Sequence, residues 1–124
     1  METKKILFAD DDPEIREVLR LLLTSEGYTV AEASSGGEVL ELLDGSVDLV
    51  ILDVMMPGLG GYAVCAEIRR RSAVPVLFLT AKGQDSDKTM GFSVGGDDYL
   101  VKPFSYTELI SRVKAMLRRY YVYG

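Results

Sequence analysis

The chain has 124 residues, of which 48% are apolar and 27% charged, enough for one ordinary hydrophobic core but not for a second domain. No apolar run approaches the 18 residues of a membrane-spanning helix. The 19 acidic and 14 basic side chains give a net charge of −5, the wrong sign for holding a nucleic-acid backbone. The only cysteine, Cys65, excludes an internal disulfide and favours a reducing compartment, and there is no histidine. Any chemistry must therefore use carboxylates, hydroxyls, lysine or a hard metal ion.

Five short apolar runs rich in β-branched residues predict strands, and stretches with helical periodicity separate them. The predicted strands cover residues 6–9, 28–33, 49–52, 76–79 and 99–101. Strict alternation of strand and helix predicts a parallel sheet with helices on both faces, because parallel neighbours need crossover connections. The runs 49–52 and 76–79 contain no polar residue and should be the most buried strands.

Local signals mark the ends of most of the expected helices. The first opens with Asp12 as N-cap and Pro13 in its first turn, and it runs to Gly27. The second and fifth helices each begin with a Ser-x-x-Glu capping box, formed by Ser35 with Glu38 and by Ser105 with Glu108. The third helix should cover 62–71 and the fourth 85–94. We interpret Cys65 as a packing residue and the arginines at 69–71 as a solvated helix end.

Ligands of such sheets bind at the carboxyl ends of the strands, so the residues that follow each strand are candidates for the site. They are Asp10, Asp11, Asp53, Thr80 and Lys102. A pair of carboxylates about 4 Å apart costs on the order of 4 kcal/mol at an effective dielectric constant near 20, so a compensating cation is expected. Mg²⁺, which prefers oxygen ligands, and the lysine would supply it. These residue types predict a phosphoryl-transfer site with a carboxylate nucleophile, a metal, a lysine and a hydroxyl donor.

The ordered set of these residues resembles the receiver domain of two-component response regulators along the whole chain. The matching stretches are Asp10-Asp11, 52–58 around Asp53, Thr80-Ala81, and 99–104 around Lys102. The resemblance implies a flavodoxin-like fold of five βα units with strand order 2-1-3-4-5. It also implies that Asp53 accepts a phosphoryl group from a sensor histidine kinase, so the chain is a phosphoacceptor that takes part in its own phosphorylation and dephosphorylation rather than an enzyme.

The resemblance further assigns a role to each site residue. Asp11 would bind Mg²⁺ directly and Asp10 through a water molecule, while Asp53 and the backbone carbonyl of Met55 would complete the protein ligands. Thr80 and Lys102 would hold the phosphoryl oxygens. After phosphorylation Thr80 would move toward the phosphoryl group and Tyr99 would turn inward. The peptide bond between Lys102 and Pro103 would be cis.

The stretch 95–119 resembles the receivers of the OmpR/PhoB winged-helix transcription factors, except that Gly96 stands where alanine is usual. Such receivers form a homodimer on phosphorylation through the fourth helix, fifth strand and fifth helix. The charge pairs implied here are Lys88 with Glu108, Asp98 with Arg112, and Asp97 with Arg119. We expect residues 1–120 to form the receiver and 121–124 to begin an interdomain linker or a tail. The protein would be cytoplasmic, would not contact a membrane, and would contact DNA only through a downstream domain.

A haloacid-dehalogenase-type Mg²⁺-dependent phosphatase is the alternative function. The run Asp10-Asp11-Asp12-Pro13-Glu14 approaches the first motif of that class, and Asp97-Asp98 resembles its late acidic motif. Against this alternative, Glu14 replaces the usual threonine or valine, and Asp53 and Lys102 would have no role. A nucleotide-binding domain is excluded because neither glycine-rich phosphate-binding pattern occurs in the chain.

Overall fold

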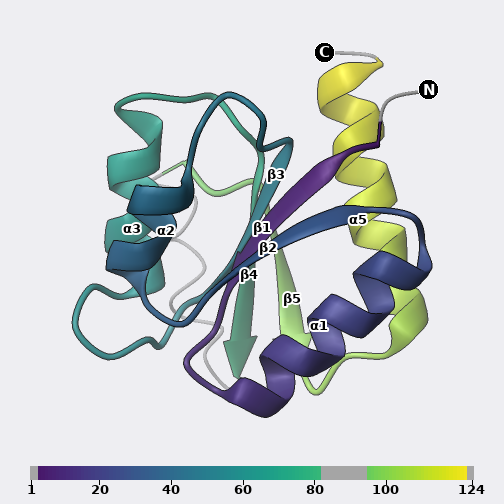
Figure 1. The fold of residues 1–124 in the computed structure, drawn as a ribbon, viewed down its shortest axis with the longest axis horizontal. Helices are drawn as coiled ribbons and strands as arrows, with labels where there is room; N and C mark the ends of the chain where they lie inside the picture. Colours follow the sequence, from purple (N-terminus) through teal and green to yellow (C-terminus); the bar gives the residue numbers. More distant parts are fainter. Residues whose placement is uncertain (1–2, 82–94, 123–124) are drawn as a thin grey trace.

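Five parallel strands in the order β2-β1-β3-β4-β5 form the sheet of the computed structural model, which describes residues 3–81 and 95–122 (Figure 1). The strands are β1 (Lys5–Ala9), β2 (Thr29–Ala33), β3 (Leu49–Asp53), β4 (Val76–Ala81) and β5 (Asp98–Lys102). The helices are α1 (Pro13–Ser25), α2 (Gly36–Leu42), α3 (Gly61–Arg69) and α5 (Tyr106–Tyr121). The predicted fold class and strand order are confirmed. The helix expected over 85–94 lies outside the described residues.

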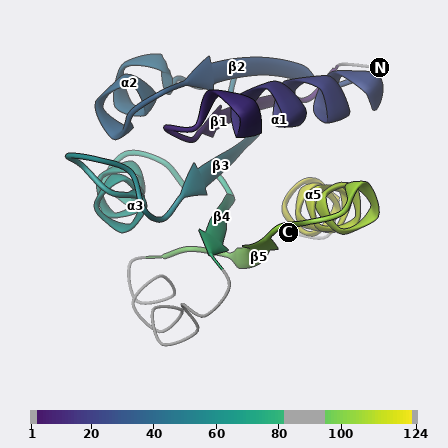
Figure 2. The same ribbon diagram turned by 90° about the horizontal axis from the view of Figure 1, so that it is seen from below.

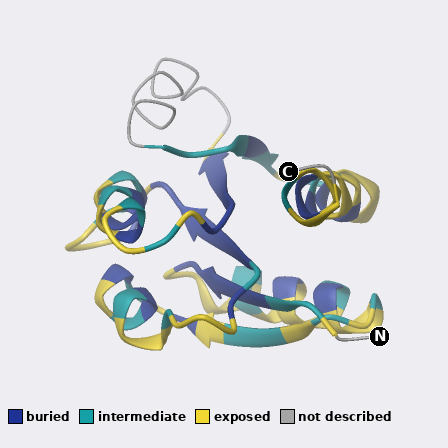
Figure 3. Ribbon diagram, turned by 90° about the horizontal axis from the view of Figure 1, so that it is seen from above, coloured by how far each residue is buried: buried dark blue, intermediate teal, exposed yellow. Residues whose placement is uncertain are grey.

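Helices cover both faces of the sheet, with α1 and α5 on one face and α2 and α3 on the other (Figure 2). Successive residues of a strand point to opposite faces, so each strand contributes to both cores. Phe8 and Ile51 pack with α1 and α5, whereas Leu7 and Leu52 pack with α2 and α3. All five residues of β3 are buried, as its uninterrupted apolar run predicted, and the central strands form the most buried part of the fold (Figure 3).

One of the two expected capping boxes is complete. In α5 the Ser105 hydroxyl accepts from the Glu108 backbone N–H and the Glu108 carboxylate accepts from the Ser105 N–H, each at 3.0 Å. In α2 the Ser35 hydroxyl accepts from Glu38 N–H at 3.2 Å, but the Glu38 carboxylate accepts from Ser34 N–H at 2.7 Å. The box at the start of α2 is therefore not reciprocal, because Glu38 bonds to the N–H of Ser34 rather than that of Ser35.

The start of α3 brings a helix against the end of the central strand. The helix begins at Gly61, one residue earlier than expected, and ends at Arg69, two residues earlier. A Cβ atom at position 61 would lie 2.4 Å from the carbonyl oxygen of Asp53, a distance that side chains do not tolerate. Glycine therefore allows α3 to begin directly beside the residue that ends β3.

The last strand and helix differ little from expectation. The bond between Lys102 and Pro103, after β5, is cis, as the resemblance implied. Helix α5 continues to Tyr121, so the expected boundary at residue 120 falls within its last turn. The Tyr121 hydroxyl donates to the carbonyl oxygen of Asp48 at 2.7 Å, which ties this turn to the segment before β3.

Candidate functional site

Asp10, Asp53 and Thr80 are buried polar residues at the carboxyl ends of three neighbouring strands. Asp10 directly follows β1, Asp53 is the last residue of β3, and Thr80 is the penultimate residue of β4. Because the three strands are parallel, these residues meet at one edge of the sheet. The structure therefore gathers these three buried polar side chains at the edge that the sequence predicted for the site.

Lys102, the last residue of β5, brings a positive charge to the same edge. Its ammonium nitrogen lies 2.7 Å from Asp10 Oδ2 and 3.4 Å from Asp53 Oδ1. The other oxygen of Asp10 accepts a hydrogen bond from the Asp12 N–H at 3.0 Å. The lysine thus offsets the repulsion between the two carboxylates, and Asp10 is held on both of its oxygens.

Three carboxylates are placed to share a cation. Asp10, Asp11 and Asp53 each offer an oxygen, and these atoms all lie within 4.8 Å of one another. Asp11 is exposed, so the cluster is open to solvent on one side, and the exposed Met55 follows in the loop after β3. A donor set of carboxylate oxygens without nitrogen or sulfur fits Mg²⁺, which also keeps several waters. The three carboxylates expected around the metal are therefore brought together.

The electrostatics of Asp53 differ from those of an ordinary carboxyl group. Burial and the neighbouring Asp10 charge raise its pKa to about 6, although Lys102 and a hydrogen bond from the Met55 N–H at 3.3 Å act in the opposite direction. For Lys102, burial alone would lower the pKa, but the hydrogen bond and charge of Asp10 and the charge of Asp53 outweigh it, so the pKa is raised. Without a metal, Asp53 therefore resists ionisation while Lys102 stays charged.

Thr80 and Tyr99 lie on the adjacent strands β4 and β5. The Thr80 hydroxyl is 3.4 Å from the carbonyl oxygen of Ala81. Tyr99 is 5% exposed and its ring lies 5.3 Å from that of Phe78, its partner in the strand register. Phe78 and Thr80 are two residues apart on one strand and so share the sheet face that Tyr99 covers. The two residues expected to act as a switch are therefore neighbours on the α2–α3 face, with Tyr99 already buried.

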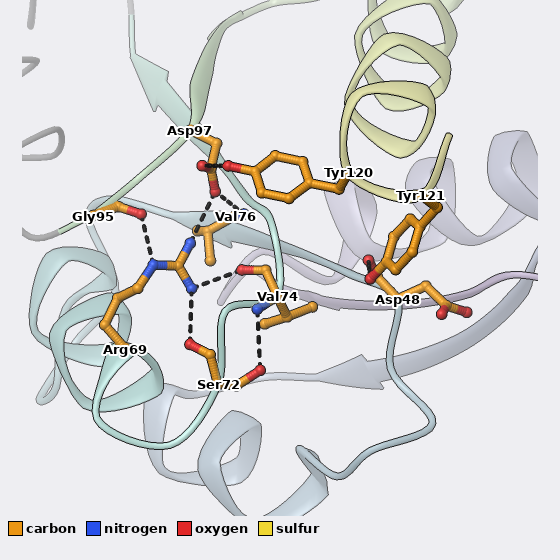
Figure 4. A network of polar contacts seen from close by, with 9 residues as sticks. All are labelled: Asp48, Arg69, Ser72, Val74, Val76, Gly95, Asp97, Tyr120 and Tyr121. Atoms are coloured by element: carbon orange, nitrogen blue, oxygen red, sulfur yellow. Dashed lines mark hydrogen bonds and ion pairs between the residues drawn. The ribbon is translucent and has the colours of Figure 1, made fainter. Parts of the chain in front are cut away.

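The acidic residues expected on the dimer face have partners within the same chain. Arg112 of α5 lies 2.9 Å from an oxygen of Asp98. Asp97 has three donors: the Arg69 guanidinium at 2.8 Å, the Val76 N–H at 2.7 Å, and the Tyr120 hydroxyl (Figure 4). Asp97 is thus engaged inside the molecule rather than presented at its surface.

The interpretation of the arginine run at 69–71 was wrong for Arg69. Its side chain is 23% exposed, and besides Asp97 it donates to the carbonyl oxygens of Gly95 at 2.9 Å and Val74 at 2.7 Å (Figure 4). It therefore joins the end of α3 to the segments that precede β4 and β5. The carbonyl oxygens and Asp97 satisfy the guanidinium, which is why it leaves the solvent.

The remaining dimer-face residues are placed less specifically. Glu108 forms the capping box of α5, and Arg119 is exposed in the last turns of that helix. Lys88, the expected partner of Glu108, lies outside the described residues.

Arg16 of α1 also reaches the site, and the sequence reasoning missed it. Its guanidinium donates to the carbonyl oxygen of Asp10 at 2.8 Å and lies 3.5 Å from Glu32 of β2. A cation in the first turn opposes the helix dipole, and that anomaly is the signal that could have identified it. Cys65, in contrast, is a buried packing residue as predicted, and burial raises the pKa of its thiol to about 11.

Curated proteins similar to this chain are transcriptional regulators. The chain is 51% identical over 119 residues to the uncharacterized transcriptional regulatory protein YrkP of Bacillus subtilis, covering 96% of this chain and 52% of that protein. It is 48% identical over 116 residues to the transcriptional regulatory protein ResD of the same bacterium, covering 93% and 48%. The chain thus spans about half the length of these relatives.

The family of response regulator receiver domains matches residues 6–114. The chain belongs to that family. A crystal structure of a response regulator receiver domain protein from Clostridium thermocellum has a TM-score of 0.90 and 30% sequence identity, and the match covers 98% of this chain and 99% of that one. The resemblance drawn from the strand-end residues is confirmed, and the chain is a receiver domain of a two-component response regulator.

The receiver fold separates the two acidic motifs of the phosphatase alternative. Asp97 precedes β5 and binds the N–H of Val76 at the start of β4, whereas Asp10 and Asp11 follow the end of β1. The motifs lie at opposite edges of a parallel sheet and cannot form one active site. Among the described helices, none has the length and apolar character needed to cross a bilayer.

Proposed function

We propose that this receiver accepts a phosphoryl group on Asp53 from the phosphohistidine of a sensor histidine kinase. The observation that carries the proposal is the carboxylate of Asp53 itself, buried at the end of the central strand and 3.4 Å from the Lys102 ammonium. A carboxylate oxygen forms the new bond to phosphorus as the bond between phosphorus and the histidine nitrogen breaks. The product is an aspartyl phosphate, and the histidine leaves with the bonding electrons.

The surrounding residues stabilise the charge that this transfer develops. Lys102 is close enough to pass from the Asp53 carboxylate to an oxygen of the incoming phosphoryl group, and the Thr80 hydroxyl donates to another. Asp11, Asp53 and the Met55 carbonyl would bind Mg²⁺, and Asp10 would hold it through a water. When bound, Mg²⁺ neutralises the carboxylates and the phosphoryl oxygens, so a dianion can enter an acidic site.

Intact-mass measurement after treatment with acetyl phosphate tests this proposal. The parent should gain one phosphoryl group in Mg²⁺ and none in excess EDTA, and Asp53→Asn should gain none. Asp12→Asn is the matched control, because it removes a carboxylate from the same loop while asparagine still caps α1. Full labelling of Asp53→Asn, or full labelling in EDTA, would contradict the proposal.

Phosphorylation would then change the face formed by the fourth helix, β5 and α5 and promote a symmetric dimer. The Asp98 and Arg112 pair, now within one chain, would exchange partners between copies about a two-fold axis. Pairing of Asp97 with Arg119 of a second copy would require Asp97 to release Arg69 and Tyr120. Exposed ion pairs contribute only about 0 to 1 kcal/mol each, so they set register more than affinity.

Sedimentation of phosphorylated variants tests the dimer. Arg112→Glu should weaken it, and adding Asp98→Arg should partly restore it by reversing the pair. Thr80→Ala should slow labelling without abolishing it, and it should uncouple labelling from dimerisation, because the switch begins at that hydroxyl. Dimerisation of Arg112→Glu at the parent's affinity would rule out the charge-pair interface, and a normal response of Thr80→Ala would rule out the switch.

The relatives suggest the output. Because the curated proteins that share this receiver are transcriptional regulators of about twice its length, we propose that the dimer controls a DNA-binding domain joined after α5. The receiver would act in the cytoplasm, where its kinase partner and DNA are found.

A further inference from the structure

Arg16 occupies an unusual position, since its positive charge lies in the first turn of α1 but its side chain turns back toward the β1–α1 loop. One guanidinium nitrogen donates to the carbonyl oxygen of Asp10 at 2.8 Å, and another lies 3.5 Å from a Glu32 carboxylate oxygen. The side chain is 19% exposed. The contact with Glu32 of β2 restrains the guanidinium, so the hydrogen bond to Asp10 has a fixed donor.

The bond acts on the peptide group that joins Asp10 to Asp11. The Asp10 side chain is already held by Lys102 and by the N–H of Asp12. Within residues 3–81 and 95–122, in contrast, no hydrogen bond reaches the Asp11 carboxylate. The position of that carboxylate therefore depends on its backbone and its own side-chain rotamer, and Arg16 holds the carbonyl of the preceding peptide.

We propose that Arg16 is a positioning residue for Mg²⁺: by holding the carbonyl oxygen of Asp10, it aims the exposed Asp11 carboxylate at the oxygens of Asp10 and Asp53. The inference deepens the proposed function and rests on it, because it concerns the same phosphoryl-transfer site. Ligand-orienting groups of this kind commonly change metal affinity about tenfold or more when they are removed.

Charge repulsion alone predicts the opposite change in Mg²⁺ affinity when Arg16 is removed. The sign of that change therefore distinguishes positioning from repulsion. A guanidinium bonded to the backbone of Asp10 repels Mg²⁺ bound nearby, and Coulomb's law predicts that its removal tightens metal binding. If the guanidinium positions Asp11, its removal loosens the peptide, and metal binding weakens although the site becomes more negative. Arg16→Gln removes both the positive charge and the several N–H donors of the guanidinium. Arg16→Lys keeps the charge but removes the planar arrangement of those donors.

Calorimetric titration of the unphosphorylated chain with Mg²⁺ provides the measurement. We expect Arg16→Gln to raise the Mg²⁺ dissociation constant about tenfold and Arg16→Lys to raise it less, since one ammonium cannot serve both Asp10 and Glu32. Arg20→Gln is the matched control: it removes the same charge one turn further along α1, where the exposed side chain pairs with Glu17. That variant should bind Mg²⁺ like the parent or slightly tighter.

Two further measurements separate positioning from a general loss of structure. Thermal unfolding in EDTA should show that Arg16→Lys folds, and labelling by acetyl phosphate should reach the parent's maximal rate once Mg²⁺ exceeds its raised dissociation constant. Parent-like or tighter Mg²⁺ binding by both Arg16 variants would overturn the inference and leave the proposed function intact. A parent chain that binds no Mg²⁺ would overturn both.

Discussion

Replacement of Asp97 by alanine should destabilise the receiver much more than the same replacement at its neighbour Asp98. The Asp97 side chain is only 13% exposed and holds Arg69, the Val76 N–H and the Tyr120 hydroxyl. The Asp98 pair with Arg112 is more open, with side chains 29% and 42% exposed. The two adjacent carboxylates therefore carry the same charge, but Asp97 connects three other parts of the chain, whereas Asp98 pairs with Arg112 at a more exposed position.

The expected magnitude follows from these exposures. Removing one partner of a fully buried ion pair costs about 3 to 5 kcal/mol, and an exposed pair contributes about 0 to 1 kcal/mol. Arg69 is 23% exposed and keeps two carbonyl acceptors, so Asp97→Ala should lower the free energy of unfolding by about 2 to 3 kcal/mol. Asp98→Ala should lower it by less than about 1 kcal/mol.

Urea unfolding followed by circular dichroism suits this chain, which has no tryptophan. For a domain of this size, Asp97→Ala should lower the urea midpoint by about 1 to 2 M. Tyr120→Phe should cost about 1 kcal/mol alone and almost nothing when Asp97 is already alanine. Equal, small effects of Asp97→Ala and Asp98→Ala would refute the assignment of Asp97 as an internal connection.

Three further predictions concern the site and the core. In EDTA, the raised pKa of Asp53 makes its contribution to stability favourable at low pH, and this contribution is lost as pH rises from about 4 through about 6. Asp53→Asn should therefore be about 2 kcal/mol more stable than the parent at pH 7.5. Urea titrations should find this difference in the free energy of unfolding reduced at pH 5. Gly61→Ala should cost about 1 to 3 kcal/mol and slow labelling by acetyl phosphate, whereas Gly45→Ala, with open space around it, should do neither. Cys65 should react with a thiol reagent at pH 8 only in unfolding concentrations of urea, because the folded thiol is inaccessible and its pKa is about 11.

Local sequence chemistry predicted the parts of this fold that depend on neighbours in the chain. Asp12 caps α1, the Ser105 box starts α5, and the apolar run of β3 is buried on both faces, each for a reason contained in a few residues. The site was also predictable, because parallel strands bring their final residues to one edge whatever their order. The strand order itself came from the family resemblance, since the pattern within a strand does not specify its neighbours.

The contacts that sequence analysis missed join residues far apart in the chain. Arg69 reaches Asp97, 28 residues away, and Arg16 of α1 reaches Glu32 of β2, the next element along the chain. An arginine at a helix end looks the same in a sequence whether it is solvated or drawn inward by carbonyl groups. Only the folded geometry shows which carboxylate or carbonyl lies within its reach.

The separation of Asp10 and Lys102 by 92 residues has a consequence for the chain during its synthesis. Asp10 and Asp53 are synthesised before Lys102, whose ammonium offsets their repulsion and belongs to the last strand. A ribosome must therefore translate past residue 102, and release that segment from its exit tunnel, before the site can assemble. If Asp53 accepts a phosphoryl group as proposed, unfinished chains should not compete with complete receivers for the kinase.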